Sequence, residues 1–163
     1  MELARRYLVI NHDVTFDSIP MAYDIFGLRH VQRVSDGARF HWHARRNGES
    51  AEAPRVGSLL IWEPRGYFKG TGHVAVIVGI QVRNLCISFT TEDVHPGSVY
   101  EACSLAMQAG SIDIVEQNVF DSVWPLGQEF SRRLKAGVVK ESGAFYIEDS
   151  FRDTRILGWM TLD

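Results

Sequence analysis

The sequence is poor in cysteine: Cys86 and Cys103 are the only two among its 163 residues. Two cysteines do not make the disulfide framework on which small secreted domains depend. The first residues, MELARRYLVINHD, also lack the basic, then apolar, then small-residue order of a signal peptide. We therefore expect a reducing compartment, the cytoplasm.

An excess of positive charge and long apolar runs are missing too. The chain carries 17 Lys and Arg against 20 Asp and Glu, for a net charge of −3. Without a basic field there is no electrostatic basis for binding DNA, RNA or an anionic membrane surface. Apolar runs such as VGSLLIW and HVAVIVGI have the length of strands, far short of the roughly 20 residues of a membrane span. We expect neither nucleic acid nor membrane as a partner.

What is present is the composition of one ordinary globular domain. Hydrophobic residues make up 45% of the chain and charged residues 23%. The length suffices for one hydrophobic core. No internal repeat or low-complexity tract divides the chain, so residues 1–163 are expected to form a single domain.

Helical patterns come first along the chain. ELARRYLV places its apolar side chains on one helical face, but no capping residue precedes Glu2. A second helix is predicted from Ser18, with Pro20 in its first turn, where a missing N–H costs little. Residues 35–53 are polar and contain two glycines, so we expect a long loop around the short stretch RFHWH.

The pattern then changes to strands. Short runs rich in β-branched and aromatic residues alternate with clusters of Gly, Pro and Asp, which is typical of an antiparallel sheet. The predicted strands are 57–62, 73–80, 111–118, 130–137, 144–149 and 155–160. Helices followed by strands favour an α+β fold over an alternating α/β fold.

One pair of predicted strands places polar side chains where they can react. Alternation puts His73 on one face of GHVAVIVGI, and puts Glu116 and Asn118 on one face of SIDIVEQN. If the two strands are antiparallel neighbours, Glu116 or Asn118 reaches the imidazole and orients it as a general base. The alternative is that both residues simply end a strand in a polar turn.

Several longer blocks carry a family resemblance. ELARRYLVINHDVTF, MAYDIFGLR, GSLLIWEPRGYFKGTGHVAVI, IVEQNVFDS and RDTRILGWM closely resemble the amidase domain of glutathionylspermidine synthetase/amidase, a CHAP-type cysteine amidase of the papain-like NlpC/P60 group. The resemblance covers nearly the whole chain apart from one internal segment. It implies a papain-like α+β fold, with N-terminal helices followed by an antiparallel β-sheet, and no metal or organic cofactor.

The resemblance also implies a substrate and a set of roles. Enzymes of this family hydrolyse the amide that joins the glycine of glutathione to spermidine, so the expected partner is a small-molecule thiol–polyamine conjugate. His73 matches the general base, Glu116 matches its acidic partner, and Asn118 borders the site. Arg5 matches a contact for a substrate carboxylate, which a guanidinium can hold with two hydrogen bonds. Taken alone, Arg5 is equally well a solvated helix residue.

The family's nucleophile has no counterpart in the printed chain. The family motif runs Cys, any residue, Glu, an aromatic residue or Leu, Ala, Arg, whereas this chain begins MELAR. The resemblance therefore implies a nucleophilic cysteine immediately before Met1, at a helix N-terminus that favours the thiolate. Neither Cys86 nor Cys103 is a good substitute, because both lie in the one segment that matches nothing in the family.

That segment, residues 82–108, separates two strands that a short hairpin joins in the family. It begins with Val, whose codons start with GT, and ends with Gln, which CAG encodes, so a retained intron that preserves the reading frame is one interpretation. A real surface insertion is the other, since loops tolerate added length well. A transcript sequenced across Gln81 and Ala109 distinguishes the two.

Other candidates carry weaker signals. His41 and His43 share a strand face and, with His30, could bind a metal, but two histidines without a carboxylate or thiolate are more typical of a polar strand. Tyr67 and Phe68 line a substrate channel or simply pack. Trp62 and Trp159 are expected to be half-buried core residues near the cleft. Because the histidine signal is weak, no metal site is predicted.

Three functions remain open from the sequence. The first is a thiol amidase that acts on a glutathione–polyamine conjugate. The second is a catalytically inactive module that binds the conjugate without cutting it, which the printed sequence favours when taken literally. The third is cleavage of peptidoglycan cross-bridges, against which the absence of a signal peptide and of a cell-wall-binding segment counts.

Overall fold

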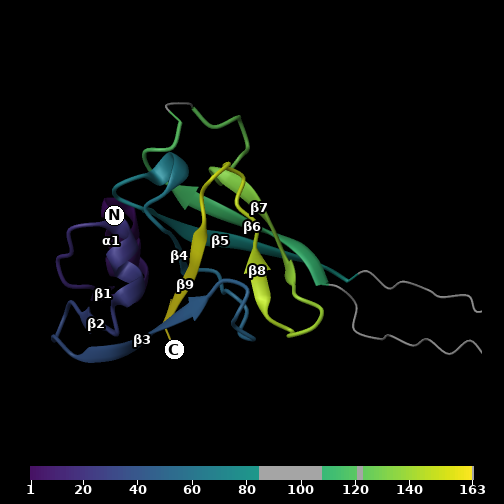
Figure 1. The fold of residues 1–163 in the computed structure, drawn as a ribbon. Helices are drawn as coiled ribbons and strands as arrows, with labels where there is room; N and C mark the ends of the chain where they lie inside the picture. The colour runs from purple at the N-terminus through teal and green to yellow at the C-terminus, as the bar shows by residue number, and fades with distance from the viewer. Residues whose placement is uncertain (85–107, 121–122, 163) are drawn as a thin grey trace, which may run out of the picture.

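The computed structural model describes residues 1–84, 108–120 and 123–162 (Figure 1). Nine strands form one sheet in the order β1-β2-β3-β9-β4-β5-β6-β7-β8, and all neighbours are antiparallel. The strands are β1 (Val14–Thr15), β2 (His30–Arg33), β3 (Arg39–Arg46), β4 (Leu59–Trp62), β5 (His73–Asn84), β6 (Gln108–Glu116), β7 (Arg132–Val138), β8 (Phe145–Ile147) and β9 (Ile156–Leu162). The helical elements of these residues are α1 (Glu2–His12) and two 3₁₀ turns, η1 (Ala22–Gly27) and η2 (Gly66–Phe68).

The predicted papain-like α+β fold with N-terminal helices is wrong. In the described part of the chain α1 is the one α-helix, and the sheet dominates. The helix predicted from Ser18 is only the six-residue 3₁₀ turn η1. Its two buried residues, Ala22 and Ile25, are three positions apart. That spacing matches the three-residue repeat of a 3₁₀ turn, so the apolar pattern did not require an α-helix.

The six predicted strands correspond to β4 to β9, and the long loop predicted over 35–53 is wrong. Residues 39–46 form β3, which pairs with β9 on one side and β2 on the other. Within β3, Trp42 is buried whereas His41 is exposed. This strand was hard to recognise because its outward face is polar and its inward face offers one large side chain.

Two hydrophobic cores lie on opposite faces of β4, whose four residues are all buried. Leu59 and Ile61 belong to the core that α1 covers with Ala4 and Leu8. The alternate residues of β4, among them Trp62, belong to the second core. Because alternate residues of a strand point to opposite faces, this strand reads as a continuous apolar run.

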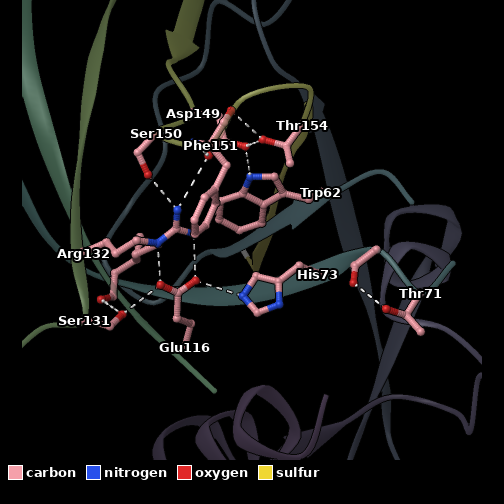
Figure 2. Close-up of polar contacts among 12 residues, drawn as sticks. Trp62, Thr71, His73, Glu116, Ser131, Arg132, Asp149, Ser150, Phe151 and Thr154 are labelled. Carbon is pink, nitrogen blue, oxygen red and sulfur yellow. Dashed lines mark hydrogen bonds and ion pairs between the residues drawn. The ribbon is translucent and has the colours of Figure 1, made fainter. Parts of the chain in front are cut away.

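The sheet curls around the second core. Its edge strand β8 meets the turn that follows β3: Ser50 forms an isolated bridge with Phe145. The side chain of Asn47 both donates to the carbonyl of Ile147, at 3.0 Å, and accepts from its N–H, at 2.7 Å. The curl places the 148–154 loop, which follows β8, beside the end of β4 and the start of β7, where the site described below is built (Figure 2).

The β5–β6 hairpin is the longest ladder and carries the predicted site. Ala75 pairs with Glu116, and the pairing continues to Asn84 and Gln108 with one irregularity between Ile77 and Gly79. Both ends of the segment 82–108 are therefore paired strand. Residues 85–107, which include Cys86 and Cys103, lie outside the described residues. Within the part of the chain that the structure describes, no helix is long and apolar enough to cross a membrane.

Candidate functional site

His73 is the first residue of β5, and its position is set by the strand beside it. Its Cα partner on β4 is Trp62. The preceding residue, Gly72, has φ of +64°, and a Cβ there would lie 2.6 Å from the carbonyl oxygen of Trp62. Only glycine accommodates both the left-handed backbone and this close approach. The glycine of the GHVAV motif thus places the histidine at the entry of the strand.

Glu116 is the last residue of β6 and faces His73. Glu116 pairs with Ala75, two residues along β5 from His73 and on the same face. The His73 Nε2 and Glu116 Oε2 atoms are 2.9 Å apart (Figure 2). The predicted adjacency of the two strands and of these two side chains is confirmed. Asn118 lies beyond the strand end with φ of +62°, and it is exposed, so Glu116 is the residue that reaches the ring.

The Glu116 carboxylate is fully enclosed by hydrogen-bond donors. Arg132 Nε lies 2.5 Å from Oε1 and its Nη2 lies 2.8 Å from Oε2. The hydroxyl of Ser131, which donates to the Ile114 carbonyl at 2.7 Å, lies 3.3 Å from Oε1. Burial raises the pKa of Glu116, but hydrogen bonds from His73 and Arg132 and their charges outweigh it, so its pKa lies below the ordinary value. Glu116 is an anion at neutral pH.

Aromatic side chains hold the imidazole in place. The Phe68 ring is stacked on His73 with centroids 4.3 Å apart, and the Trp62 ring is tilted against it at 5.3 Å. Phe68 is buried, whereas its neighbour Tyr67 is 54% exposed and stacks on Phe151. Tyr67 and Phe68 were each expected to line a channel or to pack. Both residues line the cleft, and Phe68 also packs against His73. Trp62 and Trp159, expected to be half-buried, are both fully buried.

His73 opens onto a cleft of about 330 Å³ at the start of α1. Met1, Leu3, Phe68, Lys69, Gln117 and Asn118 are among its lining residues. Gln117 joins the two elements: its Oε1 accepts the N–H of Leu3 at 3.0 Å, and its Nε2 donates to Glu2 at 3.3 Å. The residue after Glu116 therefore fixes the first turn of α1 beside the imidazole.

Arg5 lies away from this cleft. Its guanidinium sits over the Phe16 ring, 4.6 Å from the centroid, and donates to the carbonyl of Asp17 at 3.3 Å. It is not among the residues that line the cleft. The structure brings His73 and Asn118 to one opening, with Glu116 buried behind His73, but it does not bring Arg5 there. Contact between Arg5 and a substrate carboxylate remains a prediction.

Sequence reasoning missed the residues behind Glu116. Arg132 Nη1 donates to Ser150 at 2.8 Å and lies 3.7 Å from Asp149, while the Trp62 indole donates to Asp149 at 2.7 Å. A signal was present: Arg132 and Arg133 are consecutive in a predicted strand, so their side chains point to opposite faces. One arginine had to face inward, and a buried arginine requires a carboxylate.

The three histidines considered for a metal lie together on β2 and β3. The His30 and His41 rings have centroids 5.5 Å apart, and those of His41 and His43 are 4.4 Å apart. The predicted common face of His41 and His43 is confirmed. Among the residues placed by the structure, no group of three or more His, Cys, Asp or Glu side chains is arranged to hold a metal ion.

The chain resembles two curated proteins over almost its whole length. It is 36% identical over 160 residues, 98% of the chain, to a bifunctional glutathionylspermidine synthetase/amidase from Escherichia coli (strain K12). A protein of the same description from Shigella flexneri matches with the same identity and coverage. The chain spans about a fifth (21%) of the length of these relatives. No protein-family model matches the chain. The resemblance inferred from the sequence blocks is confirmed, and both relatives carry an amidase activity in their description.

Proposed function

We propose that this chain forms the site of a thiol amidase acting on a glutathione–polyamine conjugate of the glutathionylspermidine type. The nucleophile in this proposal is a cysteine immediately before Met1. The observation that carries the proposal is the shared cleft: the first turn of α1 and His73, which Glu116 contacts from behind, line one cavity. The similarity to relatives described as amidases supports it.

The arrangement suits acyl transfer. A thiol at the start of α1 experiences the positive end of the helix dipole and a neighbouring imidazolium, which both favour the thiolate. The thiolate attacks the amide carbonyl, and backbone N–H groups of the first helical turn other than that of Leu3 stabilise the oxyanion. His73 protonates the leaving amine. His73 then activates a water that hydrolyses the thioester. Glu116 stays ionised and stabilises the imidazolium at each step. No metal or organic cofactor enters this scheme.

The cleft lining suggests which half of the conjugate it holds. Apart from His73, Lys69 is the one side chain carrying a full charge among the described residues that line the cleft. The lining also includes the apolar side chains of Leu3, Pro20 and Met21. A cation and an apolar wall fit an acyl group that carries a carboxylate better than they fit a polycation. We therefore place the glutathione half in the cleft and the polyamine towards solvent.

A second candidate is binding of the conjugate without cleavage. One observation favours it: no cysteine is found among the described residues that line the cleft. The neutral ring of His73, held by Glu116, would then accept a hydrogen bond from the amide N–H of the conjugate. The two candidates differ in a single group, the thiol, and a direct comparison separates them.

Four proteins test the proposal by measuring spermidine released from glutathionylspermidine. They are the chain as printed, the chain with Cys placed before Met1, the same chain without residues 82–108, and that shortened chain with His73→Gln. We expect release from the shortened Cys-bearing protein and none from the printed chain or the His73→Gln protein. Absence of release from the two Cys-bearing proteins that keep His73, with the conjugate still bound, would refute the amidase and support the binding module.

A further inference from the structure

We infer that Arg132 is a positioning residue for His73 that acts through Glu116. By holding the Glu116 carboxylate, it leaves Oε2 to accept a hydrogen bond from His73 Nε2–H, so that Nδ1 is the unprotonated nitrogen of the neutral ring. The inference deepens the amidase proposal and rests on it for its catalytic consequence. Its structural part, the tautomer of the neutral ring, does not depend on the amidase proposal and is tested separately.

The contacts leave the carboxylate no other orientation. Arg132 Nε and Nη2 lie 2.5 and 2.8 Å from the two Glu116 oxygens, an in-plane pair of bonds that a lysine cannot reproduce. The Glu116 side chain has 0% exposure and that of Arg132 10%. His73 Nε2 approaches Oε2, the same oxygen that Arg132 Nη2 contacts. The guanidinium thus sets the direction of the one lone pair that faces the imidazole.

Arg132 is itself fixed by a second set of groups. Its guanidinium lies over the Phe151 ring, 4.4 Å from the centroid, and over Trp62 at 5.6 Å. Nη1 donates to Ser150 and lies 3.7 Å from Asp149, whose other oxygen accepts the Trp62 indole N–H (Figure 2). Thr154 also donates to Asp149. Three segments of the chain, β4, β7 and the 148–154 loop, therefore converge on the group that holds Glu116.

The charges around His73 explain why a cation is placed behind its partner. Glu116 contacts the ring, and Arg132 and Asp149 lie behind Glu116. Lys69 and the Met1 ammonium group line the cleft, and Glu2 contacts Gln117, which also lines it. Glu116, Arg132 and Asp149 together carry one net negative charge, which a protonated His73 neutralises. Without the guanidinium, two buried carboxylates would act on the imidazole. The Glu116 oxygen that faces the imidazole would then no longer be held by Arg132 Nη2.

The chain supplies a matched control on the adjacent residue. Arg133 makes the same type of paired contact, with Nε and Nη2 at 2.6 and 2.9 Å from the two oxygens of Asp113. Its side chain points to the opposite face of β7, because neighbouring residues of a strand alternate. Asp113 pairs with Gly79, beyond the irregularity in the β5–β6 ladder and away from His73. Removing Arg133 therefore removes an ion pair of the same geometry, though a more exposed one, without touching the imidazole.

The first experiment uses the chain as printed and identifies the tautomer of the neutral His73 ring by NMR with nitrogen labelling. In the unmodified chain we expect the Nε2–H tautomer. Arg132→Met should mix the two tautomers, while Arg133→Met should leave the single tautomer. Arg132→Lys should not restore the single tautomer, because a lysine cannot make the paired contact with Glu116. Equal His73 spectra in the Arg132→Met and Arg133→Met proteins would overturn the inference, and Arg132→Lys serves the same comparison if Arg132→Met does not fold.

The second experiment places the same variants in the Cys-bearing protein. Arg132→Met should lower kcat about 10- to 100-fold, as loss of an outer partner typically does, with KM little changed. If the Cys-bearing protein is inactive, the amidase proposal fails while the NMR result still decides the role of Arg132. If kcat is unaffected although the tautomer changes, the catalytic consequence is refuted.

Discussion

The imidazole of His73 lies parallel to the ring of Phe68, with an angle of 3° between the planes and 4.3 Å between the centroids. Glu116 holds the ring at one edge, at Nε2, and Phe68 covers one face. The first contact fixes a nitrogen, and the second fixes the plane. A general base needs both, because proton transfer depends on the direction of the lone pair.

The first prediction concerns that flat contact. Phe68→Leu should destabilise the fold by less than about 1.5 kcal/mol, since apolar volume is largely kept. It should nevertheless lower kcat of the Cys-bearing protein, because the ring of His73 gains freedom to rotate. The control is Tyr67→Leu. It removes another ring that lines the same cleft, but this ring does not stack on His73. Urea denaturation and spermidine release measure the two effects, and equal kcat in both variants would contradict the role given to Phe68.

The second prediction concerns the pH dependence of stability. The pKa of Glu116 is lower in the folded protein than its ordinary value, because hydrogen bonds from His73 and Arg132 outweigh its burial. The stabilisation is therefore present above the unfolded pKa of about 4.3 and is lost as the pH falls through the folded pKa. Glu116→Gln should cost about 3–5 kcal/mol at neutral pH, because it leaves Arg132 buried without its anion. Urea denaturation should show that the difference in the free energy of unfolding between the unmodified protein and Glu116→Gln becomes smaller in acid.

Gly72 gives the third prediction. Gly72→Ala would place a Cβ 2.6 Å from the Trp62 carbonyl oxygen and 2.8 Å from the Tyr23 Cβ, at a φ of +64°. Backbone strain alone costs about 1–3 kcal/mol. We expect Gly72→Ala to lower the free energy of unfolding by more than this and to displace His73. Gly70→Ala is the control: its φ is +92°, but no atom lies within 4 Å of an added Cβ. Thermal denaturation should separate the two, with the larger shift for Gly72.

The fourth prediction tests which half of the conjugate occupies the cleft. Lys69→Met should raise KM up to about fivefold with kcat unchanged, the size expected for one exposed charge contact. Lys140→Met, which changes a lysine after β7, should leave both constants unaltered. A conjugate whose acyl half lacks carboxylates should be insensitive to Lys69→Met. A similar rise in KM for that substrate would show that Lys69 acts on something other than a carboxylate.

The pairing that builds the site was predictable from the chain because alternation reports faces directly. His73 and Glu116 each lie in an apolar alternating strand, and only an antiparallel arrangement brings them together. The alternation of side chains along a strand shows which face each residue occupies, but it does not show which other residues pack behind that face. Arg132 and Asp149 were therefore missed. Both are charged residues close to turns, a setting in which most such residues are solvated.

The class of fold was mispredicted for a different reason. The spacing of apolar residues over Ala22–Gly27 fits an α-helix and a 3₁₀ turn equally, and the start signals at Ser18 and Pro20 favoured the α-helix. Likewise β3 has one large inward residue, Trp42, between two histidines. A strand whose outer face is so polar resembles a loop until its partners β2 and β9 are known.

Because β4 has a packed core on each of its faces, neither core can open without uncovering the strand that supports the other. Calorimetry should therefore record a single transition, with equal van't Hoff and calorimetric enthalpies. A cavity made in one core, for example by Ile114→Ala, should also speed the hydrogen exchange of amides beneath α1. The helix that faces the cleft thus depends for its rigidity on side chains it never touches.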